Sequence, residues 1–172
     1  MLIDIKSISH SKGASMAIEV EKSPDELPFS SLAYRLTRPL SFSGTLTNTG
    51  DGILTLTGRI QTAFSGECAR CLAPVTCDLN LSLSESYQAA ATLATAADEP
   101  DEESYRYAGN QLDLSQAIRD NLVLALPQRL LCREDCLGLC PDCGNNLNEK
   151  NCGCAAAREG KASPFDQLKQ LL

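Results

Sequence analysis

Cysteine is the residue type through which this chain could do most of its chemistry. Six of the nine cysteines lie in the stretch CREDCLGLCPDCGNNLNEKNCGC, from Cys132 to Cys154, and Cys68-Ala-Arg-Cys71 adds a Cys-x2-Cys pair far upstream. A tetrahedral Zn²⁺ ion takes four thiolates at about 2.3 Å, and a Cys-x2-Cys turn supplies two of them from one short piece of backbone. The spacing therefore predicts zinc.

The eight cysteines of these two stretches divide into two sets of four. Cys140-Pro-Asp-Cys143-Gly144 has the form of a zinc knuckle, in which the glycine tolerates positive φ and lets backbone N–H groups turn toward the sulfurs. Cys152-Gly-Cys154 completes a local site. Cys132 and Cys136 then need two more ligands, which the upstream pair can supply. We predict two structural Zn²⁺ ions, one bound by Cys140, Cys143, Cys152 and Cys154, and one bound by Cys68, Cys71, Cys132 and Cys136.

Other thiol chemistry stays open at these positions. Cys-Pro-x-Cys is also a redox sequence, although redox pairs of this type normally sit at a helix N-terminus after a strand. Iron–sulfur ligation also uses four cysteines. Hydrolytic zinc needs an open coordination position, often with histidine ligands, and the one histidine, His10, lies in a predicted turn and is expected at the surface. Because no acid–base pair or phosphate loop is evident, we expect a protein that is not an enzyme, with redox and nuclease functions as alternatives.

The net charge of −7 argues against a protein that holds nucleic acid by bulk electrostatic attraction. Any RNA contact must use a local basic patch, and we expect Arg70, Arg129 and Arg133 to form one, because the long-range zinc site would bring Cys71 and Cys132 together. No apolar run reaches the roughly 18 residues that span a bilayer, and the N-terminus lacks the pattern of a signal peptide. We therefore expect a cytoplasmic protein, in which clustered cysteines are ligands or redox groups rather than disulfides.

A β-rich core must position the cysteine pairs. Alternation of apolar and polar residues predicts strands over 2–7 and 15–21, with a turn between them, and two longer runs that are separated by a hairpin signal at 48–52. The second run leads into the upstream cysteine pair, and the alternation resumes over 74–87, so that this pair sits at a hairpin tip. Cys77 is in step with the apolar face of that strand and is expected to be a small buried side chain rather than a ligand.

Two helices are predicted in the second half of the chain. Asp113 is predicted to be an N-cap, with Gln116 as its capping-box partner. Apolar residues follow at helical spacing, and Pro127 ends the predicted helix. Ser163-Pro164 gives a cap and a first-turn proline for a final helix. The acidic stretch over 88–104 has no sustained pattern and is expected to be a mobile loop.

These elements predict an α+β protein, built as an antiparallel β-sheet or partly closed barrel with a few helices and a zinc-stapled C-terminal segment. We expect a β-rich core domain over 1–127, which includes one packing helix and the acidic loop at about 88–104. A cysteine-rich zinc segment and C-terminal helix over 128–172 are expected to pack on this core.

Several sequence blocks together carry a family resemblance. They are GECARCLAPV, then DNLVLALPQRLLC with CLGLCPDCGNNLN and CGC, and finally SPFDQLKQLL. They closely resemble the cysteine-rich, zinc-binding branch of the YceD-like family, the bacterial and plastid proteins required for accumulation of large-subunit ribosomal RNA. The matching blocks cover 66–75 and 120–172, while the N-terminal strands fit the family in outline.

The resemblance implies a ribosome biogenesis factor without catalytic activity. Its implied partner is large-subunit (23S-type) ribosomal RNA or an early large-subunit particle, with a ribosomal protein as a further candidate, and no membrane or small-molecule substrate is expected. Ser163-Pro164-Phe165 stands where many cysteine-rich members have Asp-Pro-Arg. This departure removes an arginine that could contact RNA at that position. The alternative hypotheses are a thiol redox protein that uses the Cys-Pro-x-Cys pair and a nuclease that processes ribosomal RNA.

Overall fold

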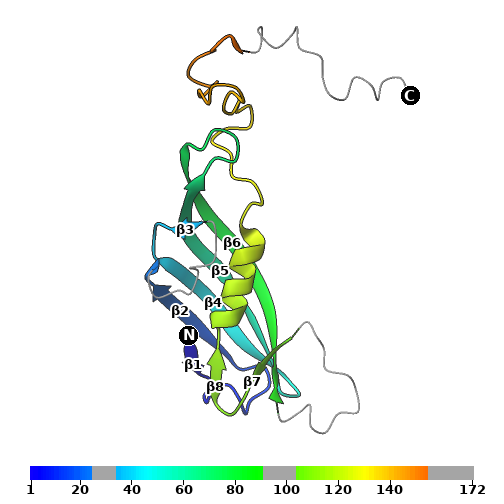
Figure 1. The fold of residues 1–172 in the computed structure, drawn as a ribbon. Coiled ribbons are helices and arrows are strands. Elements are labelled where there is room, and N and C mark those ends of the chain that lie inside the picture. The colour runs from blue at the N-terminus through cyan, green and yellow to red at the C-terminus, as the bar shows by residue number, and fades with distance from the viewer. Residues whose placement is uncertain (25–33, 91–103, 155–172) are drawn as a thin grey trace, which may run out of the picture. The chain divides into compact units, whose positions relative to one another are not determined.

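The computed structural model describes residues 1–24, 34–90 and 104–154 of the chain (Figure 1). The chain divides into two compact units: unit 1 comprises Met1–Gly66 and Thr76–Gln128, and unit 2 comprises Glu67–Val75 and Arg129–Leu172. The hairpin tip is thus grouped with the cysteine-rich segment, whereas the division expected from the sequence placed it in the core domain. Within the described part of the chain, no helix is both long and apolar enough to cross a membrane.

The main sheet has its strands in the order β2-β4-β5-β6-β7, with β3 paired to β5 beyond the end of β4. These strands are β2 (Ser15–Lys22), β3 (Arg35–Leu36), β4 (Leu40–Gly50), β5 (Ile53–Glu67), β6 (Pro74–Ala89) and β7 (Tyr105–Tyr107). β2 and β7 lie at the two edges, so the sheet is open rather than a partly closed barrel. β7 runs parallel to β6, which departs from the all-antiparallel expectation.

The predicted β4–β5 hairpin forms as expected. Its turn uses Gly50, Asp51 and Gly52, all with positive φ, and a register shift follows Asn48. Alternate residues of the two strands face the core, as the period of two in their sequences predicts. β1 (Leu2–Asp4) is shorter than expected and pairs with β8 (Gln111–Asp113) rather than with the strand that follows it.

A single helix is found in the described residues, α2 (Ser115–Ala125), and it packs on one face of the sheet (Figure 1). Its buried residues Ala117, Ile118 and Leu122 belong to the same apolar core as the inward side chains of the sheet. The N-cap position differs by one residue from the prediction: Asp113 still belongs to β8 and Leu114 is the N-cap, but Oδ1 of Asp113 accepts the N–H of Ser115 at 2.9 Å. The final helix predicted from Ser163 and residues 91–103 of the acidic loop lie outside the described residues.

Candidate metal centres

A turn at the tip between β5 and β6 positions the first cysteine pair. The N–H of Leu72 donates to the carbonyl oxygen of Cys68 at 2.9 Å, and the N–H of Cys68 donates to the carbonyl oxygen of Ala73 at 2.8 Å. Leu72 has a φ of 60°, in the left-handed region, so the chain reverses directly after Cys71. The side chains of both cysteines are buried.

The chain that follows residue 128 brings the second pair of cysteines to this turn. The N–H of Ala69 donates to the carbonyl oxygen of Leu130 at 2.8 Å, and the N–H of Leu139 donates to the carbonyl oxygen of Arg70 at 3.1 Å. Gly138 has a φ of 77°, and a Cβ there would lie 3.0 Å from the carbonyl oxygen of Arg70. Glycine is therefore needed for the close approach of the two backbones.

Four sulfurs from these segments form the long-range cluster: Cys68, Cys71, Cys132 and Cys136. All four lie within 4.8 Å of one another, with 3.8 Å between the Sγ atoms of Cys68 and Cys136 and 3.6 Å between those of Cys71 and Cys132. Sulfurs placed about 2.3 Å from the centre of a tetrahedron are about 3.8 Å apart, whereas a disulfide joins sulfurs at about 2.05 Å. The spacing therefore fits a single tetrahedral ion.

A second group of sulfurs, the local cluster, comes from one short stretch: Cys140, Cys143, Cys152 and Cys154. Its sulfurs also lie within 4.8 Å of one another. The N–H of Gly144 donates to the carbonyl oxygen of Cys140 at 2.9 Å, which repeats the hydrogen bond of the first turn. Gly144 and Gly153 have φ values of 74° and 72°. The structure thus brings together the same two sets of four that the spacing predicts.

Backbone N–H groups favour the thiolate form at Cys68 and at Cys140. Burial raises the pKa of Cys68, but N–H groups, that of Arg70 foremost, outweigh burial and lower its pKa to about 6. At Cys140, the N–H groups of Cys143 and Asp142 lower the pKa to about 7. These sulfurs are therefore poised to act as metal ligands near neutral pH.

Each cluster also contains a thiol whose deprotonation is opposed by its neighbours. The interaction with the Cys136 side chain is the main cause that raises the pKa of Cys132 to about 12, and the interaction with the Cys152 side chain does the same for Cys154. A bound cation would remove this opposition, because it offsets the charge of all four thiolates at once. Metal binding is therefore expected to release protons.

The donor sets fit zinc. Four thiolates fill every position of a tetrahedral ion and leave none for water, which is the pattern of structural rather than hydrolytic zinc. A polynuclear iron–sulfur cluster distributes its thiolates over several iron atoms and so needs sulfurs further apart than one mononuclear ion does. The observed spacing therefore favours a single ion in each cluster.

The remaining predicted residues lie apart from both clusters or beside them. Cys77 is half-buried on β6 and joins neither cluster, and His10 is exposed in a turn after β1. Arg70 and Arg133 are engaged within unit 2: Arg70 Nη1 donates to the carbonyl oxygen of Cys136 at 2.7 Å, and Arg133 forms a 3.4 Å ion pair with Asp135. Neither contact could be predicted from the sequence, because both depend on the turns between the cysteines.

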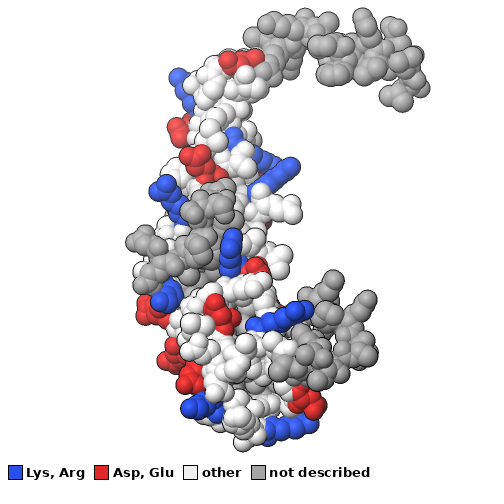
Figure 2. Space-filling model, turned by 60° about the horizontal axis from the view of Figure 1, so that its bottom comes forward, with Lys and Arg blue, Asp and Glu red and all other residues white. Residues whose placement is uncertain are grey.

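Arg129 differs from these two arginines. Its side chain is exposed and makes no hydrogen bond or ion pair with any residue that the structure describes. On the face shown in Figure 2, basic and acidic side chains are interspersed and no continuous basic surface is seen. Whether the three arginines act together on RNA therefore stays a prediction.

Asn148 is a residue near the metal ligands that the sequence analysis missed. Its Nδ2 donates to Sγ of Cys136 at 3.3 Å. The sequence NNLN contains several asparagines at no metal-ligand spacing, so nothing distinguishes this one before the fold is known.

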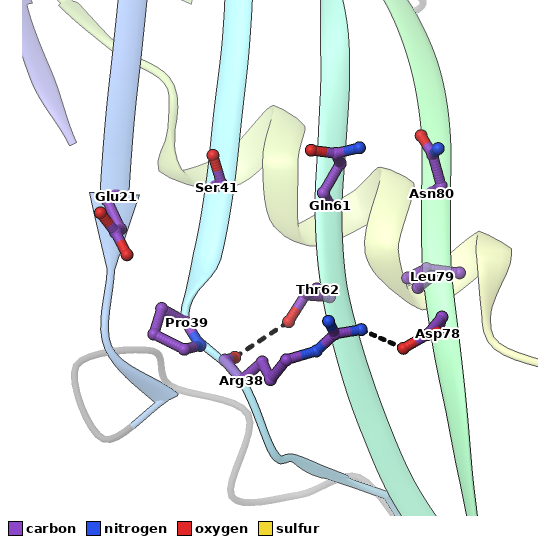
Figure 3. Close-up of a pocket in the computed structure, with 9 residues that line it drawn as sticks. All are labelled: Glu21, Arg38, Pro39, Ser41, Gln61, Thr62, Asp78, Leu79 and Asn80. Atoms are coloured by element: carbon purple, nitrogen blue, oxygen red, sulfur yellow. Dashed lines mark hydrogen bonds and ion pairs between the residues drawn. The ribbon is translucent and has the colours of Figure 1, made fainter.

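A polar hollow of about 400 Å³ lies on the sheet of unit 1, where the sequence suggested no site (Figure 3). Glu21, Ser41 and Gln61 are cross-strand neighbours in its floor, and Arg38 forms an ion pair with Asp78 at one side. Among the described residues, the lining holds two carboxylates against one guanidinium and no aromatic ring. Neither phosphate attraction nor base stacking therefore favours RNA at this hollow.

Comparison with known proteins gives several relatives. Uncharacterized proteins of Mycobacterium tuberculosis and Mycobacterium bovis are each 33% identical over 147 residues, which covers 84% of this chain and 69% of each relative. The chloroplastic protein of Arabidopsis thaliana named large ribosomal RNA subunit accumulation protein YCED homolog 1 is 33% identical over 63 residues, or 36% of this chain and 20% of that protein. No solved structure matches the chain.

One family model also matches, that of the large ribosomal RNA subunit accumulation protein YceD, over residues 56–172. The matched range contains all eight cysteines of the two clusters. The matched range also includes the sequence blocks that carry the family resemblance, so the resemblance is confirmed. The chain therefore belongs to the YceD family.

Proposed function

We propose that this protein is a non-enzymatic factor of ribosome biogenesis that supports the accumulation of large-subunit ribosomal RNA. The observation that carries this proposal is the family match over 56–172, which spans both cysteine clusters. The Arabidopsis relative is likewise named as a large ribosomal RNA subunit accumulation protein.

Zinc has a structural role in this proposal. Among the described residues of unit 2, the buried cluster consists of Cys68, Cys71 and Cys136, with four partly buried apolar residues packed against it. So small an apolar core cannot offset the conformational entropy that ordering the segment costs, whereas structural zinc in peptides contributes about 10 to 16 kcal/mol. Two Zn²⁺ ions would therefore hold unit 2 in its folded form.

Unit 2 is also the proposed contact for ribosomal RNA or an early large-subunit particle. Its described part holds four Arg or Lys against five Asp or Glu, so that an RNA contact must be local. The guanidinium of Arg129 makes no hydrogen bond or ion pair with described residues, whereas hydrogen bonds hold the guanidinium groups of Arg70 and Arg133 in place. An oriented guanidinium keeps further N–H donors for phosphate, since it carries five.

The test is complementation of cells that lack the gene. Arg129→Glu is expected to lower the amount of large-subunit ribosomal RNA and to weaken co-sedimentation with large-subunit precursors as salt rises, while zinc content stays at about two per chain. Arg59→Glu, at an exposed position on β5, is the matched control and should behave as the wild type. Equal effects of both variants, or no effect of either, would contradict a contact through Arg129.

A thiol redox function is the second candidate. It is favoured by the lowered pKa of Cys140, about 7, and by the exposure of Cys143. The pair lies in a turn rather than at a helix N-terminus, which disfavours it. Metal analysis of protein purified under reducing conditions separates the two functions. About two zinc ions per chain with unreactive thiols would support the structural role of zinc, and no metal with reactive thiols would support redox chemistry.

A further inference from the structure

The loop of the local cluster is bonded to the chain that links the two clusters. Between Cys143 and Cys152, residues 145–148 run beside residues 137–140. The N–H of Cys140 donates to the carbonyl oxygen of Asn145 at 2.7 Å, and the N–H of Leu147 donates to the carbonyl oxygen of Gly138 at 2.9 Å. Backbone hydrogen bonds therefore join the loop of the local cluster to the segment that lies between the two clusters.

The side chain of Asn148 extends from this loop into the long-range cluster. Its Nδ2 donates to Sγ of Cys136 at 3.3 Å, while its Oδ1 accepts the N–H of Leu137 at 2.8 Å and Nη2 of Arg133 at 2.7 Å. One amide thus contacts a ligand sulfur, the backbone directly after that ligand, and a neighbouring guanidinium.

The orientation of this amide is fixed by its own partners. Oδ1 faces two donors, whereas Nδ2 faces a sulfur and the Oδ1 of Asn146, at 2.8 Å. Exchanging the amide oxygen and nitrogen would place donors against donors, so the network settles the assignment. The backbone N–H of Asn148 also donates to Oδ1 of Asn146, at 3.0 Å. Asn148 is thus held by the same loop that carries Cys143 and Cys152.

Groups that contact a metal ligand tune how well it binds. An N–H donated to a thiolate stabilises its charge and fixes its direction, and removing such a partner typically costs about 10- to 100-fold in metal affinity. The benefit requires that the donor be held in place. Here the donor is held by a loop whose two ends meet in the other cluster.

We propose that Asn148 couples the two metal sites, so that zinc in the local cluster raises the zinc affinity of the long-range cluster. Zinc at Cys143 and Cys152 closes the loop, the closed loop orients Asn148, and Asn148 positions the Cys136 thiolate. Because coupling between binding sites is reciprocal, zinc in the long-range cluster favours the local site by the same factor. The proposal rests on the structural zinc proposed above.

The experiment measures Zn²⁺ affinity at the long-range cluster of the full chain by competition with a chromophoric chelator under reducing conditions. In Cys152→Ser with Cys154→Ser, which leaves one complete site, this affinity is expected to fall by about 10- to 100-fold. Asn148→Ala should lower it to a similar extent. Adding Asn148→Ala to the cysteine double variant should cause little further loss, because both act through one amide. The coupling would be overturned if the combined variant lost affinity by the product of the two separate factors. It would also be overturned if the cysteine double variant bound zinc at the long-range cluster as tightly as the wild type.

Asn148→Asp tests the donor directly. The aspartate keeps an oxygen for Leu137 and Arg133 but can donate neither to the sulfur nor to Oδ1 of Asn146, so the thiolate absorption of bound Co²⁺ is the readout that separates the lost donor to sulfur from a structural effect. We expect Asp to be at least as damaging as Ala, and Co²⁺ absorption bands should report a changed thiolate environment. Asn145→Ala, an exposed asparagine of the same loop, is the control and should bind as the wild type. A wild-type chain that binds no zinc would refute the structural metal itself, whereas two independent zinc sites would refute the coupling alone.

Discussion

The residue that follows the second cysteine differs between the two Cys-x2-Cys turns. Leu72 and Gly144 make the same 2.9 Å hydrogen bond, with φ values of 60° and 74°. A leucine in the left-handed region costs about 1 kcal/mol more than a glycine. Leu72→Gly is therefore expected to raise the stability of unit 2 by about that amount, measured as slower zinc release to a chelator.

Gly144→Leu is the reciprocal variant and should speed zinc release. A Cβ at this position would meet no atom within 4 Å, so strain alone would act. Leu72 is 57% exposed and loses little packing when it is removed. If Leu72→Gly instead releases zinc faster, contacts of the leucine outweigh its strained backbone.

Tyr87 is a buried residue whose hydroxyl has no hydrogen-bond partner among the described residues. An unpaired buried hydroxyl costs about 1 to 3 kcal/mol, so Tyr87→Phe is expected to raise the free energy of unfolding by about 1 kcal/mol at pH 7. Urea denaturation measures this change. Tyr107→Phe is the matched control and should destabilise, because it removes a 3.1 Å hydrogen bond to the carbonyl oxygen of Gly52.

The same residue predicts how stability changes in alkali. Burial, and then the nearby Tyr105, raises the pKa of Tyr87 well above its usual range. Because the folded-state pKa lies above the unfolded value of about 10, the contribution of Tyr87 is complete below pH 10 and is lost as the pH rises through the folded-state value. The phenylalanine variant should lose less stability than the wild type between pH 8 and pH 10.5. Parallel losses would mean that Tyr87 does not carry the alkaline dependence.

At the scale of elements, a pair of glycines on β4 and β5 leaves space for the ring of Phe42 against the two strands. Gly44 and Gly58 are direct cross-strand partners beside the ring of Phe42. A Cβ on Gly58 would lie 2.6 Å from Cε2 of Phe42 and 2.7 Å from the carbonyl oxygen of Ser43. Gly58→Ala is therefore expected to lower the free energy of unfolding by about 1 to 3 kcal/mol, measured with urea. Thr57→Ala, at the exposed neighbouring position, should change it far less.

The sequence predicted those elements whose signal is local. The β4–β5 hairpin and α2 were expected because alternation, turn residues and helical spacing each lie within one stretch. The pairing of β1 with β8 and of β7 with β6 was missed, since strands of three residues carry too little pattern to specify a distant partner. The grouping of the cysteines was predictable because only a few pairs existed, whereas the contacts of Asn148 depend on turn geometry.

At the scale of the whole molecule, the two units differ in what stabilises them. In the part of the chain that the structure describes, unit 1 has an apolar core of sixteen buried residues, whereas the buried cluster of unit 2 consists of three cysteines. Chelation of zinc is therefore expected to unfold unit 2 and to leave the sheet of unit 1. Hydrogen exchange should show lost protection in the described residues after 128 and retained protection in β4 and β5. Loss of protection throughout would mean that unit 1 is not stable by itself.

The two clusters should also differ in their effect on unit 1. Cys71 and Cys132 are 61 residues apart, and the chain between them contains Thr76–Gln128 of unit 1. A permanent crosslink over such a loop would remove denatured-chain entropy worth about 4 kcal/mol, while the local cluster closes a loop outside unit 1. With zinc in excess, Cys68→Ser with Cys71→Ser should therefore lower the melting temperature of the sheet more than Cys152→Ser with Cys154→Ser. Each double variant should also lose about one zinc ion. If the first pair changes neither melting temperature nor zinc content while Cys132→Ser with Cys136→Ser releases metal, the four sulfurs of the long-range cluster do not share one ion.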